Sequence, residues 1–168
     1  MKILITGANG FLGKIITNEL LKDNILNTLS RTSGDYMISL EKEIPNFNQN
    51  FELVIHAAGK VHSAAINDTE KQKFYNINVE GTRNLLKGLE QKSVPKQFVF
   101  ISSVSVYGQQ TGININENHP LLAKDPYGLS KIQAEQVVLD WCKKNNVTCT
   151  ILRLPLLVGE NPPANLGA

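Results

Sequence analysis

Three glycines directly after the first apolar segment restrict the fold of this chain more than any other feature. Residues 2–6, Lys-Ile-Leu-Ile-Thr, are rich in β-branched side chains, as in a strand buried on both faces. Gly7, Gly10 and Gly13 follow, and residues 11–22 carry apolar side chains at helical spacing. Glycine permits a tight turn and close packing of a helix on a strand. The pattern therefore predicts a strand, a tight turn and a helix that packs back on the strand.

The rest of the chain repeats this alternation. Further strands are predicted over 25–29, 36–40, 51–58, 97–102 and 148–154, and further helices over 71–91 and 125–144. Regular alternation of strand and helix implies a parallel sheet with right-handed crossovers. We expect a Rossmann-type, doubly wound α/β domain over residues 1–160, with helices on both faces of the sheet.

The position of the glycines, between a buried strand and a helix, is typical of dinucleotide-binding folds. Gly10 would let the backbone approach a pyrophosphate, and the helix N-terminus would offer N–H groups to the phosphates. A glycine-rich turn of purely structural origin is the alternative. The carboxylate expected about 20 residues further on, to hold a ribose diol, is missing from residues 29–32, Leu-Ser-Arg-Thr. Arg31 can pair with a 2′-phosphate, which slightly favours NADP over NAD, unless Arg31 is simply a solvated loop residue.

A second constellation combines a phenol, an amine and a hydroxyl. Tyr127 and Lys131 lie four residues apart at the start of a predicted helix, hence on one face of it. The ammonium is expected to favour the phenolate and so to lower the pKa of Tyr127 toward the range of an acid–base catalyst. Ser102 and Ser103 end a predicted strand at the sheet edge where ligands bind. The alternatives are a chance Tyr-Lys spacing and serines that merely cap the strand.

Six blocks of sequence occur in a recognisable order. They are Thr6–Gly13, His56–Gly59, Asn78–Thr82, Ser102–Gly108, Tyr127–Lys131 and Leu152–Pro155. Together they resemble the extended short-chain dehydrogenase/reductases of the NAD-dependent epimerase/dehydratase family, which act on nucleotide sugars. The resemblance runs through almost the whole chain.

The resemblance implies roles for individual residues. Ser103 would be the catalytic hydroxyl, Tyr127 the general acid/base, and Lys131 the residue that tunes Tyr127 and binds the nicotinamide ribose. Contacts with NAD or NADP would also come from Gly7, Gly10, Phe11, Leu12, Gly13, Ala57, Ala58, Gly59 and Pro155. Substrate contacts are expected at Lys60, Ser103 and Asn165, and Asn78 is expected to support the fold near the site.

One departure from the family pattern narrows the expected reaction. Family dehydratases carry Asp-Glu after the catalytic hydroxyl residue, whereas this chain has Val104-Ser105. The resemblance therefore favours 4-epimerisation or reduction of a 4-keto sugar over 4,6-dehydration. Residues 59–62, Gly-Lys-Val-His, resemble members from bacterial surface-polysaccharide pathways, which suggests a UDP-linked N-acetylated or deoxy sugar. A non-catalytic NAD(P)-binding module of the same fold is the alternative.

Composition disfavours several other classes. A net charge of +2 does not indicate a nucleic-acid-binding protein, and the chain has no apolar run of membrane-spanning length. No signal peptide is visible, and Cys142 and Cys149 suit a reduced protein, so a cytoplasmic location is expected. No ligand cluster accompanies His56 or His62, and no metal is expected.

Family members continue beyond the cofactor-binding domain into a region that closes over the sugar nucleotide. We expect residues 161–168 to begin that region and the rest of it to be absent, as in a truncated form. A homodimer formed through the two long helices is the assembly that the relatives suggest.

Overall fold

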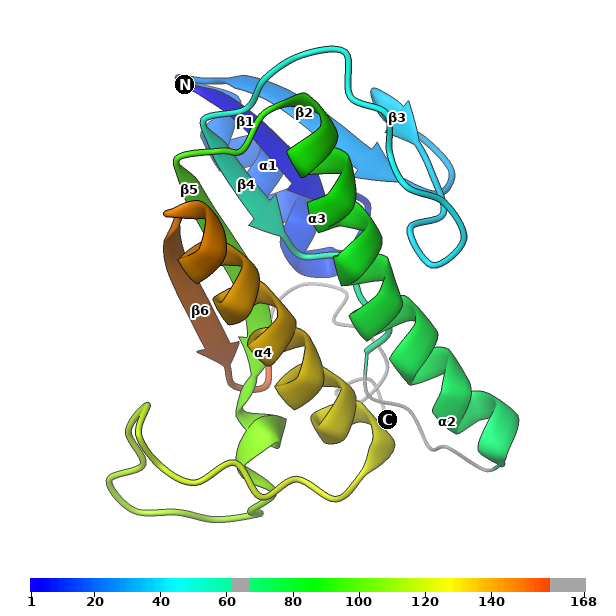
Figure 1. Ribbon diagram of the computed structural model, residues 1–168. Helices are drawn as coiled ribbons and strands as arrows, with labels where there is room; N and C mark the ends of the chain where they lie inside the picture. The colour runs from blue at the N-terminus through cyan, green and yellow to red at the C-terminus, as the bar shows by residue number, and fades with distance from the viewer. Residues whose placement is uncertain (62–66, 158–168) are drawn as a thin grey trace.

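The computed structural model describes residues 1–61 and 67–157. These residues form a parallel sheet with the strand order β3-β2-β1-β4-β5-β6 (Figure 1). The strands are β1 (Lys2–Thr6), β2 (Ile25–Ser30), β3 (Tyr36–Met37), β4 (Leu53–His56), β5 (Gln97–Ser103) and β6 (Thr148–Leu154). The chain winds outward in both directions from the neighbouring strands β1 and β4. The predicted doubly wound α/β fold is therefore confirmed.

Helices cover both faces of this sheet. They are α1 (Phe11–Leu20), α2 (Asp68–Tyr75), α3 (Gly81–Lys92) and α4 (Pro126–Asn145). Helix α1 packs on one face, while α3 and α4 lie side by side on the other (Figure 1). Helix α4 begins where the Asp125 side chain accepts a hydrogen bond from the Gly128 N–H, with Pro126 in the first turn. It ends at Asn146, whose left-handed backbone (φ 56°) closes the last turn.

The two central strands are apolar on both faces, and alternate residues serve different cores. Ile3 and Ile5 of β1 belong to the smaller core under α1. Leu4, between them, belongs to the larger core with Leu85 of α3 and Val138 of α4. This two-sided burial explains why the strand segments read as continuous apolar runs rather than as alternating patterns.

Three predicted elements differ from the structure. The strand predicted over 36–40 spans only Tyr36–Met37. The helix predicted over 71–91 consists of α2, the π-helical turn η1 (Asn76–Glu80) and α3 in succession. The strand predicted over 51–58 spans only Leu53–His56. The Ala58 N–H turns away from the backbone ladder to the Thr6 side chain at 3.2 Å, so residues 57–59 leave the sheet.

None of the helices in residues 1–61 and 67–157 combines the length and the apolar character needed to cross a bilayer.

Candidate functional site

The carboxyl ends of the six parallel strands lie at one edge of the sheet. Register places Thr6 beside Leu29 on one side and beside His56 on the other. Further along, Ser103 pairs with Leu154. The sheet order reverses between β1 and β4, which is where open α/β sheets bind their ligands. The predicted site residues therefore gather around the end of β1.

The glycine turn lies at the centre of this edge. Gly7 adopts φ +73° and donates its N–H to the Leu29 carbonyl at 3.0 Å, and a Cβ on it would lie 2.6 Å from the Ala58 nitrogen. A Cβ on Gly13 would overlap the Gly7 carbonyl, so α1 can sit this close only with glycine there. A Cβ on Gly10 would meet nothing within 4 Å except the Gly7 oxygen at 3.3 Å. The first turn of α1, which contains Phe11 and Leu12, is thus approachable beside Gly10.

A buried histidine ties the glycine turn to the neighbouring strand. His56 is 1% exposed, and its Nδ1 lies 2.6 Å from the Thr6 hydroxyl and its Nε2 2.9 Å from the Thr82 hydroxyl. Burial, with a smaller contribution from Lys131, lowers the pKa of His56 to about 3, so the ring stays neutral. Both ring nitrogens are engaged by hydroxyls, which makes His56 a structural residue. Sequence reasoning missed Thr6 and Thr82 as its partners.

No metal site accompanies this histidine in the described part of the chain. Over residues 1–61 and 67–157, no group of three or more His, Cys, Asp or Glu side chains is placed to hold a metal ion. His62, the second histidine considered from the sequence, lies outside the described residues.

Asn78 connects the loop after β4 to helix α4. Its Oδ1 accepts from the Lys60 N–H at 2.6 Å, and its Nδ2 donates to the Lys60 carbonyl at 3.1 Å and to the Ser130 hydroxyl at 2.9 Å. Ser130 donates in turn to the Tyr127 carbonyl at 2.7 Å. A Cβ on Gly59 would lie 3.0 Å from the Asn78 Oδ1 and 3.9 Å from the Lys131 Nζ. The π-helical turn that carries Asn78 thus fixes residues 57–60 beside the start of α4.

Ser103 and Tyr127 meet at this edge, as the sequence predicted. A hydrogen bond with the Ser103 side chain lowers the pKa of Tyr127, but burial raises it more, and the Asp125 carboxylate also raises it. The net shift in the pKa of Tyr127 is upward, so the expected lowering of this pKa by Lys131 is wrong. The physical reason is that desolvation of the phenolate outweighs the hydrogen bond.

Lys131 points along the sheet edge from the second turn of α4. Its Nζ donates to the Ile101 carbonyl at 2.6 Å and lies 4.4 Å from the centroid of the Phe100 ring. Burial lowers the pKa of Lys131 to about 8. Lys131 therefore sits between β5 and the loop after β4, near the main chain of Gly59.

Lys60 reaches the same region from the other side. Its Nζ lies 3.5 Å from a Glu70 carboxylate oxygen and 4.9 Å from the Phe74 ring centroid. The Phe74 and Tyr127 rings lie 6.0 Å apart, centroid to centroid. Phe74 therefore separates the Lys60 ammonium from the Tyr127 ring.

The remaining predicted residues occupy the borders of this edge. Arg31 is exposed just after β2, where the Asn9 amide ties the loop by donating to Ser30 at 2.8 Å and to Ser33 at 2.9 Å. Pro155 is exposed directly after β6. Asn165 lies outside the described residues.

A buried ion pair supports the edge from below. Glu135, 2% exposed, accepts from Arg153 Nη2 at 2.8 Å and from the Ser102 hydroxyl at 2.5 Å. Arg153 also donates to the Glu117 carbonyl at 2.9 Å and to the Tyr107 hydroxyl at 3.2 Å. The pair and the Ser102 hydroxyl join α4, β5 and β6, and no local pattern predicts this contact because Glu135 lies 18 residues from Arg153 and 33 from Ser102.

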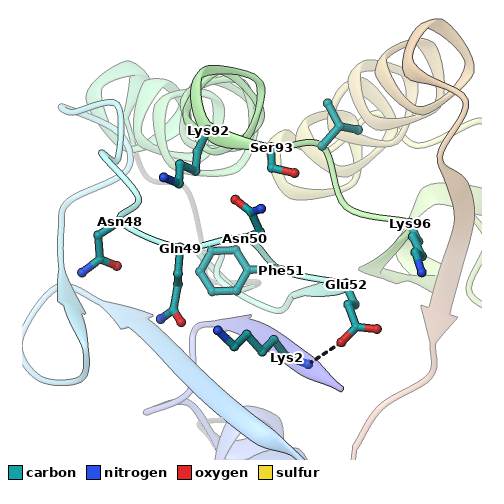
Figure 2. Close-up of a pocket in the computed structure, with 10 residues that line it drawn as sticks. Lys2, Asn48, Gln49, Asn50, Phe51, Glu52, Lys92, Ser93 and Lys96 are labelled. Atoms are coloured by element: carbon teal, nitrogen blue, oxygen red, sulfur yellow. Dashed lines mark hydrogen bonds between the residues drawn. The ribbon is translucent and has the colours of Figure 1, made fainter.

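Two hollows in the surface lie away from the glycine turn. A cavity of about 500 Å³, lined by Lys2, Phe51 and Lys92 among others, lies at the amino-terminal ends of the strands (Figure 2). Because Lys2 begins β1 and Gly7 follows its last residue, this cavity is at the opposite end of the sheet from the candidate site. A second cavity, of about 780 Å³, is bordered by Val104, Arg153 and the loop at 109–117.

Comparison with known proteins agrees with this geometry. A family model described as "NAD dependent epimerase/dehydratase family" matches residues 3–167. An N-acetyl-alpha-D-glucosaminyl-diphospho-ditrans,octacis-undecaprenol 4-epimerase from Escherichia coli O157:H7 is 30% identical, over 98% of this chain and 51% of its own. A UDP-glucose 4-epimerase from Dictyostelium discoideum is 31% identical, over 99% of this chain and 55% of its own. The chain thus spans about half the length of these curated relatives.

Solved structures show the same fold. A short-chain dehydrogenase/reductase superfamily protein from Agrobacterium tumefaciens with bound NAD is similar with a TM-score of 0.76 and 27% identity, over 91% of this chain and 48% of its own. A UDP-Glc/GlcNAc 4-epimerase from Campylobacter jejuni has a TM-score of 0.74 and 26% identity, over 90% of this chain and 52% of its own.

Proposed function

Because the chain belongs to the NAD-dependent epimerase/dehydratase family, we propose that it carries the NAD site and the proton-transfer residues of a sugar-nucleotide 4-epimerase or 4-keto reductase. The observation that carries this proposal is the hydrogen bond between Ser103 and Tyr127 at the edge that also holds the glycine turn. When bound, NAD would supply the acceptor and donor of a hydride at the sugar carbon. The presence of Ser103, Tyr127 and Lys131 together supports this proposal over the alternative of a non-catalytic NAD(P)-binding module of the same fold.

The residues of the glycine turn fit such a cofactor. Gly7 and Gly13 leave no room for side chains, while Gly10 has open space beside it at the start of α1. In the proposal, a diphosphate rests on the N–H groups of Gly10, Phe11 and Leu12, where the helix dipole is positive. The part of the cofactor that extends from the diphosphate toward the end of β5 would contact Ala57, Ala58 and Gly59. Its nicotinamide end would contact Pro155.

Each proton-transfer residue has a proposed task. Tyr127 would take the proton of the sugar hydroxyl as the carbon is oxidised and return a proton to the carbonyl oxygen on reduction. Ser103 would lie beside the same oxygen and donate its one hydroxyl proton to the phenolate. Lys131 would bind the nicotinamide ribose and stabilise the phenolate by its charge, which is gained and lost near pH 8 because burial lowers the pKa of Lys131 to about 8. Lys60 and Asn165 are the proposed substrate contacts.

For the cofactor we propose NAD. The family description names NAD, and the slight preference for NADP that Arg31 suggested finds no support there. Dissociation constants for NAD and NADP, measured for the wild type and Arg31→Ala, test this point. Tighter binding of NADP, lost in Arg31→Ala, would restore the NADP assignment.

For the substrate we propose a diphosphate-linked N-acetylhexosamine. The Escherichia coli relative is named for an N-acetylglucosaminyl diphosphate and the Campylobacter relative for Glc/GlcNAc, which agrees with the N-acetylated sugar suggested by the sequence of residues 59–62. Val104 and Ser105 replace the acidic pair of the dehydratases, which supports epimerisation or reduction. A role in surface-polysaccharide synthesis, a cytoplasmic location and a homodimer remain predictions from the family resemblance.

For the domain arrangement we propose that residues 1–160 form the cofactor-binding domain and that residues 161–168 begin a substrate-binding region. The support is that the curated relatives are about twice as long as this chain. Contacts from such a region would orient the reacting sugar carbon and exclude water.

The test combines turnover with a matched pair of variants. The chain is incubated with NAD and UDP-N-acetylglucosamine, or with reduced cofactor and a UDP-4-keto sugar, and products are followed by NMR and by absorbance of reduced cofactor. Epimer formation without net cofactor consumption identifies an epimerase, and stoichiometric consumption identifies a reductase. Tyr127→Phe should abolish either reaction while NAD still binds, whereas Tyr75→Phe, on the exposed face of α2, should leave it unchanged. NAD binding without turnover, observed for a full-length protein that includes the proposed substrate-binding region, would favour the non-catalytic module.

A further inference from the structure

Ser105 contacts the proposed catalytic hydroxyl twice. The Oγ atoms of Ser103 and Ser105 lie 3.1 Å apart, and the Ser105 main-chain N–H donates to the Ser103 Oγ at 3.2 Å. Both bonds belong to the short 3-10 turn η2 (Val104–Tyr107), which Ser103 caps. Both serines are half-buried. The second hydroxyl is therefore held next to the first by the backbone of one turn.

The same turn is held against the start of α4. A Cβ on Gly128 would lie 2.9 Å from the Ser105 carbonyl oxygen, so the absence of a side chain lets the turn and the helix touch. Tyr127 precedes Gly128 and hydrogen-bonds with Ser103. The oxygens of Tyr127, Ser103 and Ser105 thus form a continuous chain.

Counting donors shows what this chain must do during proton transfer. A serine hydroxyl has one proton to donate and two lone pairs. One lone pair of Ser103 is taken by the Ser105 N–H. When Tyr127 is a phenol, it can donate to Ser103, and Ser103 donates to Ser105. When Tyr127 is a phenolate, Ser103 must donate to Tyr127, and its second lone pair is satisfied only if Ser105 now donates.

We propose that Ser105 is a positioning residue whose hydroxyl reverses its hydrogen bond with Ser103 each time Tyr127 loses or regains a proton. The inference deepens the proposed function and rests on it, because it assumes that Tyr127 is the acid/base. Linked hydrogen bonds polarise one another, and those that end on an ion are about twice as strong as neutral ones. Loss of the Ser105 hydroxyl therefore destabilises the phenolate form of Tyr127 more than the phenol form and raises the pKa of Tyr127.

Other groups around Tyr127 act by charge or burial rather than by the relay, that is, the chain of hydrogen bonds from Tyr127 through Ser103 to Ser105. Asp125 precedes it at the helix start, and Lys131 follows one turn later with its ammonium on the Ile101 carbonyl. The Phe74 ring covers Tyr127 from α2, with Lys60 beyond it. Ser105 is uncharged, so its removal tests the relay without altering these charges.

The experiment titrates Tyr127 directly. The whole chain is produced with 3-fluorotyrosine, because ring fluorine lowers the pKa of the phenol and so the pH needed to ionise it. The ionisation of each tyrosine is followed by 19F NMR. Tyr127→Phe identifies the resonance, and circular dichroism confirms the fold at each pH. We expect Ser105→Ala and Ser105→Cys to shift the midpoint upward, because neither supplies a strong hydroxyl donor, while Ser105→Thr restores the wild-type midpoint. Val104→Ala, which alters an exposed neighbour in the same turn, should match the wild type.

The outcomes separate this inference from the proposed function. Ser103→Ala should shift the midpoint upward at least as far as Ser105→Ala does. If Ser103→Ala shifts it and Ser105→Ala and Ser105→Cys leave it unchanged or lower it, the relay is wrong and the proposed function stands. If Ser103→Ala also has no effect, the Ser103–Tyr127 pair on which the proposed function depends is itself wrong.

Discussion

The ammonium of Lys131 donates to the main-chain carbonyl of Ile101 at 2.6 Å, two residues before Ser103 on the same strand. Helix α4 is thus fastened to the strand that ends in the proposed catalytic hydroxyl. Burial in this position lowers the pKa of Lys131 from 10.5 to about 8. The titration of Lys131 therefore reports on whether its ammonium is buried at this site in the folded chain.

Lys131→Met should remove a pH dependence of stability. Between pH 8 and 10.5 the unfolded chain binds more protons at Lys131 than the folded chain, so its contribution to the free energy of unfolding rises with pH. We expect the wild type to gain on the order of 3 kcal/mol relative to Lys131→Met across this window in urea unfolding. The exposed control, Lys87→Met, should parallel the wild type. Parallel curves for Lys131→Met would mean that Lys131 is charged and solvated in the folded chain.

Two glycine-to-alanine variants should separate packing from cofactor access. Gly13→Ala would push α1 off the Gly7 carbonyl and should cost about 2 kcal/mol of stability or more, measured by chemical unfolding. Gly10→Ala has space for its methyl group and should stay close to wild-type stability while weakening NAD binding, measured by calorimetry. Equal NAD affinity in Gly10→Ala and the wild type would argue against a diphosphate at the start of α1.

Asn78→Ala should loosen the loop after β4. The Lys60 N–H and carbonyl would both lose their partner, which should cost about 2 kcal/mol in unfolding experiments. NAD affinity should fall about tenfold because Ala57–Gly59 would no longer be positioned. Asn76→Ala, in the same π-helical turn but outside this hydrogen-bond network, is the control. If both variants bind NAD like the wild type, the loop does not contribute to the site.

Much of the architecture followed from local pattern, and the reasons are visible in particular elements. The strand over 2–6 is buried on both faces, so its apolar run identified it directly, while in the strand over 97–103 alternate residues, Phe98 and Phe100 among them, are buried. The turn at Gly7 was predictable because its positive φ and the nearby Ala58 backbone exclude other residues. The position of Tyr127 four residues before Lys131 likewise placed both residues on one helical face. Ser103 was placed at the sheet edge because it follows the apolar run of its strand.

Features that depend on distant partners were not predictable. The upward pKa shift of Tyr127 arises from burial by the folded chain, which a Tyr-Lys spacing cannot reveal. The π-helical turn at 76–80 has the composition of an ordinary helix, and its reason lies in the bonds that Asn78 makes to Lys60 and Ser130.

Arg153→Ala should destabilise the chain far more than removal of an exposed arginine. It would leave the Glu135 carboxylate, 2% exposed, without its counter-ion, at a cost of about 3 kcal/mol. Arg83→Ala removes an exposed pair with Glu80 and should cost about 0.5 kcal/mol or less. Thermal and urea unfolding of both variants measure the difference. Similar small losses would show that the Glu135–Arg153 pair contributes little to the stability of the folded chain.

The most direct test of the account is to map where NAD binds by following 15N-labelled backbone amides during an NAD titration. The account predicts saturable shifts at Gly7–Gly13, Ala57–Gly59 and around Ser103 and Tyr127, with the residues of the opposite cavity, Lys2, Asn50 and Lys92, unchanged (Figure 2). Shifts confined to that opposite cavity, or no binding at millimolar NAD, would contradict it.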